Sequence, residues 1–136
     1  MVSGIDHIAI AVNSLSEALP FYQELLGLEL KGIENVPDQQ VRVAFLQAGP
    51  TKIELLEPTS DASPISKFLA KRGPGLHHIA LATEDVASKL EHLKQAGARL
   101  IDQEPKTGAA GKQIAFVHPK ASSGVLLELC SEDESS

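Results

Sequence analysis

The feature that most constrains this chain is an internal repeat. Residues 5–11 (Ile-Asp-His-Ile-Ala-Ile-Ala) and residues 76–82 (Leu-His-His-Ile-Ala-Leu-Ala) share His, Ile and two alanines at an offset of 71 residues. Each segment is followed by a helix-like stretch that ends at a glycine, Gly27 or Gly97. A period of this length is too long for a solenoid, so it predicts two similar modules side by side in one chain.

The far ends of the two halves also match. Residues 45–47, a Gly-Pro turn and residues 52–56 resemble residues 114–117, a turn and residues 125–129. Apolar runs paired across turns that contain Gly and Pro predict β-hairpins. Each half therefore contains a strand, a helix and about three strands, and we predict an α+β fold built from two tandem βαβββ modules.

The predicted boundaries lie within one domain: a first module at 1–58, a linker with a short helix at 59–75, a second module at 76–130 and an acidic tail at 131–136. Capping residues predict where the helices begin. The expected helices and their caps are residues 18–26 after Ser14, residues 65–71 after Ser63, and residues 86–95 after Asp85.

The first strand of each module has one unusual face. Alternation along residues 6–12 puts bulky Ile and Val side chains on one face and His7 with two alanines on the other. Residues 78–82 repeat this pattern, with His78 followed by two alanines. A close-packed core would fill the volume beside the alanines with larger side chains. This face therefore predicts the floor of a cavity with a histidine at its edge.

A glutamate interrupts a later apolar strand in both modules. Glu54 lies between Ile and Leu, and Glu128 lies between two leucines. A buried carboxylate without a partner is strongly unfavourable, so its recurrence at matching places indicates a function. His7 precedes Glu54 by 47 residues, and His78 precedes Glu128 by 50. We predict that these four side chains bind one divalent metal ion per chain.

The ligand types narrow the choice of metal. Two imidazoles and two carboxylates suit Co²⁺, Mn²⁺, Ni²⁺ or Zn²⁺. Taken singly, a strand histidine is more often a hydrogen-bonded edge residue, and an outer-strand glutamate is usually solvated. The two matched pairs favour the metal site.

Of the other histidines, we expect His77 to have a structural role on the opposite face, and His92 and His118 to lie at the surface.

Composition and charge exclude several classes of function. The net charge of −6 over 136 residues argues against nucleic acid or an anionic membrane as the main partner. The sequence has no apolar run long enough to span a bilayer and no signal-peptide pattern. Cys130 is the only cysteine, which precludes an internal disulfide and fits a cytoplasmic location. We expect its thiol to be buried and inert.

The motifs resemble the vicinal oxygen chelate (glyoxalase-like) superfamily and, within it, the methylmalonyl-CoA epimerase family. The closer resemblance rests on residues 52–58 (Lys-Ile-Glu-Leu-Leu-Glu-Pro), residues 61–68 (Asp-Ala-Ser-Pro-Ile-Ser-Lys-Phe), residues 118–120 (His-Pro-Lys) and residues 124–129 (Gly-Val-Leu-Leu-Glu-Leu). The matching motifs span nearly the whole chain. The resemblance implies a curved mixed sheet around a metal-containing cavity.

The resemblance also implies an activity. The expected enzyme is an isomerase of propionate metabolism that interconverts (2R)- and (2S)-methylmalonyl-CoA by removing the C2 proton through a metal-chelated enolate. It implies one divalent ion, with Co²⁺ as the first expectation, bound by His7, Glu54, His78 and Glu128; Glu128 is also the expected catalytic residue. Lys112 and Lys120 are the candidates for substrate binding. A homodimer is expected.

One position departs from the family pattern. Val43 stands where some epimerases carry a second acid, and a valine cannot transfer a proton. Glu57 is a weaker candidate for the second acid because it lies on the strand face opposite to Glu54.

Three other functions compete with the epimerase: a glyoxalase I-type lactoylglutathione lyase, an extradiol dioxygenase and a non-catalytic drug-binding module. The short linker argues against the lactoylglutathione lyase. The fourth ligand, Glu54, argues against the dioxygenase, and the retention of all four ligands argues against the drug-binding module.

Overall fold

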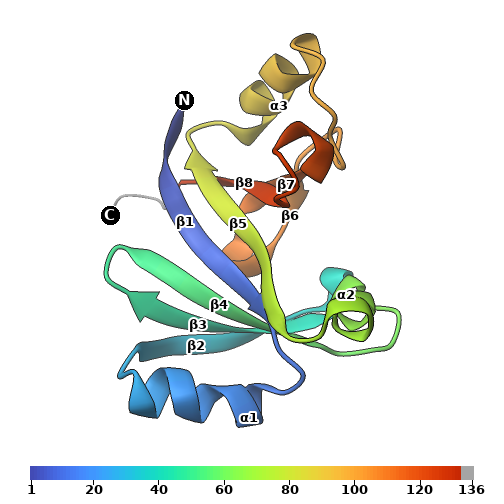
Figure 1. Ribbon diagram of the computed structural model, residues 1–136. Coiled ribbons are helices and arrows are strands. Elements are labelled where there is room, and N and C mark those ends of the chain that lie inside the picture. The colour runs from blue at the N-terminus through green and yellow to red at the C-terminus, as the bar shows by residue number, and fades with distance from the viewer. Residues whose placement is uncertain (133–136) are drawn as a thin grey trace. The chain divides into compact units, whose positions relative to one another are not determined.

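The computed structural model describes residues 1–132, which divide into two compact units (Figure 1). The first-half unit is His7–His77, and the second-half unit consists of Met1–Asp6 together with the chain from His78 onward. The strand β1 (Val2–Ala11) contributes to both units. The division therefore differs from the predicted modules at 1–58 and 76–130, because the first six residues belong with the second half of the chain.

Hydrogen bonds explain this assignment of the first residues. Ser3 Oγ donates to the carbonyl oxygen of Ala82 at 3.2 Å, and Thr83 Oγ1 donates to the carbonyl oxygen of Met1 at 3.3 Å. Of the predicted tail 131–136, Ser131 ends the last strand, Glu132 is exposed, and residues 133–136 lie outside the described part of the chain.

The first-half unit has the predicted order of strand, helix and three strands, followed by the linker helix (Figure 1). After β1 its elements are α1 (Leu15–Leu19), a π-helical turn (Pro20–Leu25), β2 (Glu29–Val36), a 3-10 turn (Pro37–Gln39), β3 (Val41–Ala48), β4 (Thr51–Pro58) and α2 (Pro64–Arg72). The strand order is β2-β3-β4-β1, with antiparallel β2–β3 and β3–β4 pairs and a parallel β1–β4 pair.

The predicted first helix forms, but its second half is wider than an α-helix. Ser14 caps it as expected, since its Oγ accepts a hydrogen bond from the N–H of Glu17 at 3.4 Å. Pro20 has no N–H, and beyond it the N–H of Leu26 donates to the carbonyl oxygen of Phe21, five residues earlier, at 2.9 Å. Gly27, at φ 78°, ends the helix in the left-handed region.

One face of the first-half sheet packs against α1, as the strand alternation predicts. The buried residues of this cluster are Val12, Leu15, Ala44, Leu46 and Leu55, with partly buried neighbours that include Ile10, Ile53 and Ala18. Of the bulky face of β1, Ile10 and Val12 belong to this cluster, whereas Ile8 does not. The opposite face of the same strands is therefore free to carry polar side chains.

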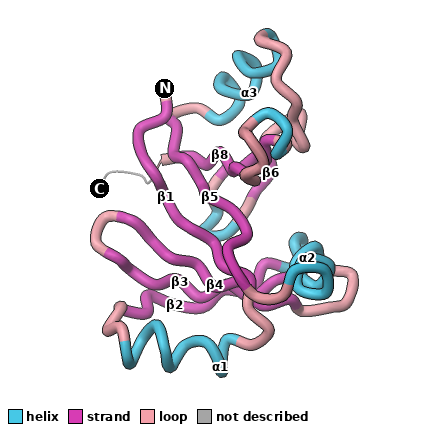
Figure 2. Tube along the Cα trace, in the orientation of Figure 1, coloured by secondary structure: helices cyan, strands magenta, loops and turns pink. Residues whose placement is uncertain are grey.

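The second-half unit repeats this arrangement in shorter form. Its elements are β5 (Gly75–Thr83), which begins in the first-half unit, α3 (Val86–Gln95), β6 (Lys106–Thr107), a 3-10 turn (Ala109–Gly111), β7 (Gln113–Val117), a 3-10 turn (Pro119–Ala121) and β8 (Leu127–Ser131). The strand order is β5-β8-β7-β6, with a parallel β5–β8 pair and antiparallel β7–β8 and β6–β7 pairs. Figure 2 distinguishes these strands from their connecting loops.

The α3 helix and its sheet share a separate apolar cluster. Its buried residues are Val86, Leu90, Ala115, Val117 and Leu129. Asp85 caps the helix as predicted, since its Oδ1 accepts a hydrogen bond from the N–H of Ser88 at 3.2 Å. The predicted α+β class and the two βαβββ modules are confirmed. Among the described residues, no helix combines the length and the apolar character needed to cross a membrane.

Candidate functional site

The first predicted ligand pair comes together inside the first-half unit. The parallel register of β1 and β4 sets Ala9 opposite Glu54, so His7, two residues before Ala9, lies on the same face as the carboxylate. His7 Nδ1 is 3.1 Å from Glu54 Oε2. His7 is 6% exposed and Glu54 is 5% exposed, so the two polar side chains form a buried pair.

The second predicted pair has the same construction inside the second-half unit. Ala80 lies opposite Glu128 in the parallel β5–β8 register, and His78 precedes Ala80 by two residues. His78 Nε2 is 3.7 Å from Glu128 Oε2, and the two residues are 5% and 4% exposed. The His78 and Phe116 rings also pack edge to face, with their centroids 5.3 Å apart, and this contact restricts rotation of the His78 ring.

The alanines that follow each histidine were predicted to form the floor of a cavity. Ala9 and Ala11 are fully buried, as is Ala80. In the second-half unit, Ala80 and Ala82 pack with their neighbours on the same sheet, Cys130, Ile114 and Phe116. The small side chains thus let the residues of adjacent strands approach the histidine closely.

The donor atoms of each pair fit a divalent metal ion. Imidazole nitrogen and carboxylate oxygen are the ligands that Zn²⁺, Co²⁺, Ni²⁺ and Mn²⁺ accept, and each unit offers one of each type in a buried setting. Both carboxylates belong to hydrogen-bonded strands, Glu54 to β4 and Glu128 to β8, so the sheet fixes their main-chain positions. Rigid, buried donors of these two types are what a metal-binding site requires.

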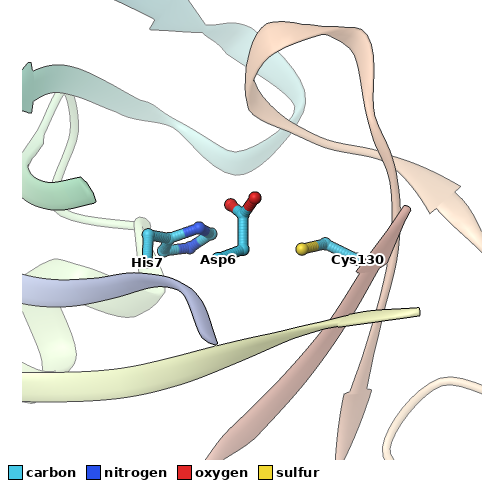
Figure 3. A group of neighbouring side chains, drawn as sticks. All are labelled: Asp6, His7 and Cys130. Carbon is cyan, nitrogen blue, oxygen red and sulfur yellow. The ribbon is translucent and has the colours of Figure 1, made fainter. Parts of the chain in front are cut away.

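A second buried polar group lies in the second-half unit. Lys112 Nζ is 2.7 Å from Asp6 Oδ1, and the two side chains are 12% and 6% exposed. Figure 3 shows Asp6 beside Cys130, whose sulfur is directed toward it. Burial first, and then the charges of Asp6 and Glu128, raise the pKa of the Cys130 thiol, which keeps it protonated and unreactive. Sequence reasoning missed the Asp6–Lys112 pair because 106 residues separate its members.

The other predicted substrate-binding lysine has a different setting. Lys120 is exposed on the 3-10 turn Pro119–Ala121, which begins at His118. His118 Nδ1 accepts a hydrogen bond from the Lys120 N–H at 3.0 Å and thereby caps this turn. His118 thus lies partly exposed in a turn at the surface, as predicted, and its ring also holds the turn in place.

The remaining histidines lie as expected. The His77 ring packs edge-on against Phe68 of α2, with ring centroids 5.0 Å apart. Burial lowers the pKa of His77 to about 4, so this ring stays neutral near pH 7. His92 is exposed on α3.

The strand faces show which of the two positions considered for a second acid, Val43 and Glu57, lies on the same side of the sheet as Glu54. Val43 is 2% exposed and pairs with Leu56 of β4, on the same face as Glu54. Glu57 lies on the opposite face: its Oε2 accepts a hydrogen bond from the N–H of Leu15 at 2.8 Å, and its Oε1 lies 3.2 Å from Arg42. The prediction that Glu57 faces away from Glu54 is confirmed.

Comparison with known proteins gives consistent matches over nearly the whole chain. The model of the Glyoxalase/Bleomycin resistance protein/Dioxygenase superfamily matches residues 6–116. The ethylmalonyl-CoA/methylmalonyl-CoA epimerase of Cereibacter sphaeroides is 44% identical over 131 residues, which cover 95% of this chain and 98% of that protein.

Two solved structures have the same fold. A hypothetical protein from Bacillus halodurans is 48% identical, with a TM-score of 0.94 and coverage of 97% of this chain and 96% of that one. The methylmalonyl-CoA epimerase of Mycobacterium tuberculosis is 37% identical, with a TM-score of 0.92 and coverage of 98% and 90%.

Proposed function

Because the chain belongs to the Glyoxalase/Bleomycin resistance protein/Dioxygenase superfamily, we propose that it is a metal-dependent methylmalonyl-CoA epimerase. The reaction interconverts the (2R) and (2S) epimers by moving the proton on C2. Full-length similarity to a relative named for this activity supports the proposal over a lactoylglutathione lyase, for which the matching relative is 27% identical over 111 residues and is covered to 38% of its length.

The observation that carries the proposal is the repeated His–Glu pair. His7 with Glu54 and His78 with Glu128 occur at equivalent register positions of the two units, and all four residues are at most 6% exposed. Two buried imidazoles and two buried carboxylates in a repeated arrangement are difficult to explain as core packing. We assign all four as ligands of one divalent ion per chain, with Co²⁺ as the first choice.

The bound ion would supply electrostatic stabilisation for negative charge on the thioester oxygen. The chain's own residues then have two tasks. The paired strands hold the ligand side chains in place, and Glu128 accepts the C2 proton as the C–H bond breaks and its electron pair moves toward the thioester carbonyl. C2 lies between the thioester carbonyl and the carboxylate, and delocalisation of the electron pair onto the thioester oxygen stabilises the carbanion that loss of the C2 proton leaves.

The CoA portion of the substrate requires positive charge outside the ligand set. We assign this contact to Lys120, which is exposed and can reach a phosphate as a point charge. Lys112, the other candidate, already faces the Asp6 carboxylate at 2.7 Å. We further propose that the protein is a cytoplasmic homodimer that acts in propionate metabolism. Exposed Phe21, Leu25 and Leu26 offer apolar surface for self-association.

Proton NMR of methylmalonyl-CoA in D₂O tests the function. Purified protein with cobalt should erase the C2 proton signal, metal removal should stop the loss, and return of cobalt should restore it. A metal-loaded protein that leaves the signal intact would refute the epimerase proposal. Activity on a glutathione hemithioacetal in that case would assign the glyoxalase chemistry to the same four ligands.

A further inference from the structure

Phe116 of β7 lies beside both proposed ligands of the second-half unit. The antiparallel β7–β8 register pairs Phe116 directly with Glu128. Residues paired across strands point to the same side of a sheet, so the Phe116 ring lies on the face that carries the Glu128 carboxylate. The ring also packs edge to face against the His78 ring. One aromatic side chain is therefore the neighbour of the imidazole and of the carboxylate in the same His–Glu pair.

Hydrogen bonds fix the main chain of Phe116 from the side away from β8. Its N–H donates to Asp102 Oδ2 at 2.8 Å, and its carbonyl oxygen accepts hydrogen bonds from the N–H groups of Ile101 at 3.0 Å and Asp102 at 3.2 Å. Phe116 and Glu128 consequently form a non-hydrogen-bonded pair of the antiparallel ladder, the type in which the two side chains lie closer together.

A cation contacts the ring itself. Lys106 Nζ is 5.2 Å from the centroid of the Phe116 ring, within the range of a cation–π contact. The same ammonium group lies 3.3 Å from Asp102 Oδ1. Asp102 therefore holds Phe116 twice, through a hydrogen bond to its main chain and through the lysine that contacts its ring.

Phenylalanine recurs with the ligands in the first-half unit. The β3–β4 register pairs Phe45 with Glu54 in the same way as the β7–β8 register pairs Phe116 with Glu128. The chain has four phenylalanines, and two of them stand opposite the two proposed ligand glutamates. The recurrence indicates that the aromatic side chain belongs to the repeated site and is not a general filler of the core.

Metal affinity depends on ligands that are held in one orientation before the ion binds. We infer that Phe116 is a positioning residue for His78 and Glu128, and that Asp102 and Lys106 hold it in place. The inference rests on the proposed four-ligand metal site. Phe116 takes no part in proton transfer. It lowers the Kd for the metal because the His78 ring, already restricted, loses less conformational freedom on binding.

Calorimetric titration of the metal-free protein with CoCl₂ tests the inference. Phe116→Leu keeps an apolar side chain but removes the ring, and it should raise the Kd for Co²⁺ about tenfold or more, the usual effect of losing a group that orients a ligand. Phe116→Tyr retains the ring and should restore the wild-type Kd. Phe21→Leu removes an exposed ring and should leave the Kd unchanged. The visible absorption of bound Co²⁺ should change only in Phe116→Leu.

Two lysine variants test the support of the ring. The Lys106 side chain is 45% exposed, so Lys106→Met should fold normally, and it should raise the Kd about two- to fivefold, the equivalent of one exposed cation–π contact. Lys106→Arg keeps a cation near the ring and should restore the wild-type Kd. Lys94→Met removes a lysine that also has an ion-pair partner, Glu91 at 3.9 Å, and should leave the Kd unchanged.

The unfolding temperature of each metal-free variant separates positioning from stability. A wild-type Kd in Phe116→Leu would overturn the inference, and so would a raised Kd that persists in a normally folded Phe116→Tyr. If Phe116→Leu does not fold, Lys106→Met decides: a wild-type Kd there overturns the inference. Failure of the wild-type protein to bind Co²⁺ would instead refute the proposed metal site, and the role of Phe116 with it.

Discussion

Lys112 Nζ lies 2.7 Å from Asp6 Oδ1, and the two side chains are buried next to the strand position that carries His7. Removal of one member of a buried ion pair leaves an uncompensated charge, whereas removal of both members does not. We therefore expect Lys112→Met to lower the free energy of unfolding by about 3 kcal/mol. Urea denaturation at pH 7 measures the change.

Two controls test this explanation. Lys120→Met removes an exposed lysine from the same unit and should change the unfolding free energy by less than about 0.5 kcal/mol. The double variant Asp6→Asn with Lys112→Met should recover part of the lost stability. A single Lys112→Met variant as stable as wild type, with a raised KM for the CoA substrate, would instead assign Lys112 to substrate binding.

Glu57 should contribute to stability and not to catalysis. Its carboxylate accepts a hydrogen bond from the N–H of Leu15, a donor in the first turn of α1 that has no partner within the helix. Glu57→Ala should lower the free energy of unfolding by about 1–2 kcal/mol, because that buried N–H is left without its acceptor. Its kcat should stay within a factor of two of wild type.

Glu54→Ala provides the matched comparison. It removes a proposed metal ligand from the opposite face of the same strand and should lower kcat strongly at fixed metal concentration. A loss of kcat in Glu57→Ala equal to that in Glu54→Ala would contradict the face assignment.

Metal binding should raise the unfolding temperature. A ligand that binds only the folded state at 100 times its Kd stabilises it by about 2.7 kcal/mol. Differential scanning fluorimetry of metal-free protein should therefore show an upward shift on addition of CoCl₂. The shift should be lost in His7→Ala and in His78→Ala, and retained in the exposed control His92→Ala. Full shifts in both ligand variants would refute the four-ligand assignment.

His77 should make the metal-free protein less stable in acid. Burial lowers the pKa of its ring to about 4, from 6.5 in an accessible histidine, so below pH 6.5 the unfolded chain binds a proton that the folded chain does not. Stability is complete above pH 6.5 and falls as the pH drops toward 4. Between pH 7.5 and 5 this ring should account for about 1 kcal/mol, after allowance for solvent screening of a half-buried group.

The measurement is urea denaturation of wild type and His77→Gln at both pH values. The variant should show a smaller loss of stability in acid than wild type, because the substituted side chain does not titrate. His92→Gln should behave like wild type. Identical pH dependence in wild type and His77→Gln would contradict this account.

The sequence by itself determined the order of elements in the two modules, the helix caps and the strand faces on which the four proposed ligands lie. Each rests on local chemistry: period-two alternation places a side chain on a face, and a Ser or Asp before an apolar run accepts hydrogen bonds from the first turn. Because the chain repeats its pattern, the repeat alone was enough to pair His7 with Glu54 and His78 with Glu128.

The tertiary structure alone decided the contacts between distant segments. Strand register depends on which residues of separate strands pair, and alternation cannot reveal it. Register places Phe116 opposite Glu128, and the folded chain brings Lys112 to Asp6 across 106 residues. Tertiary hydrogen bonds likewise assign Met1–Asp6 to the second-half unit. The strand faces of the proposed ligands follow from local periodicity, whereas the contacts between distant segments follow from the free energies of strand pairing and side-chain packing in the folded chain.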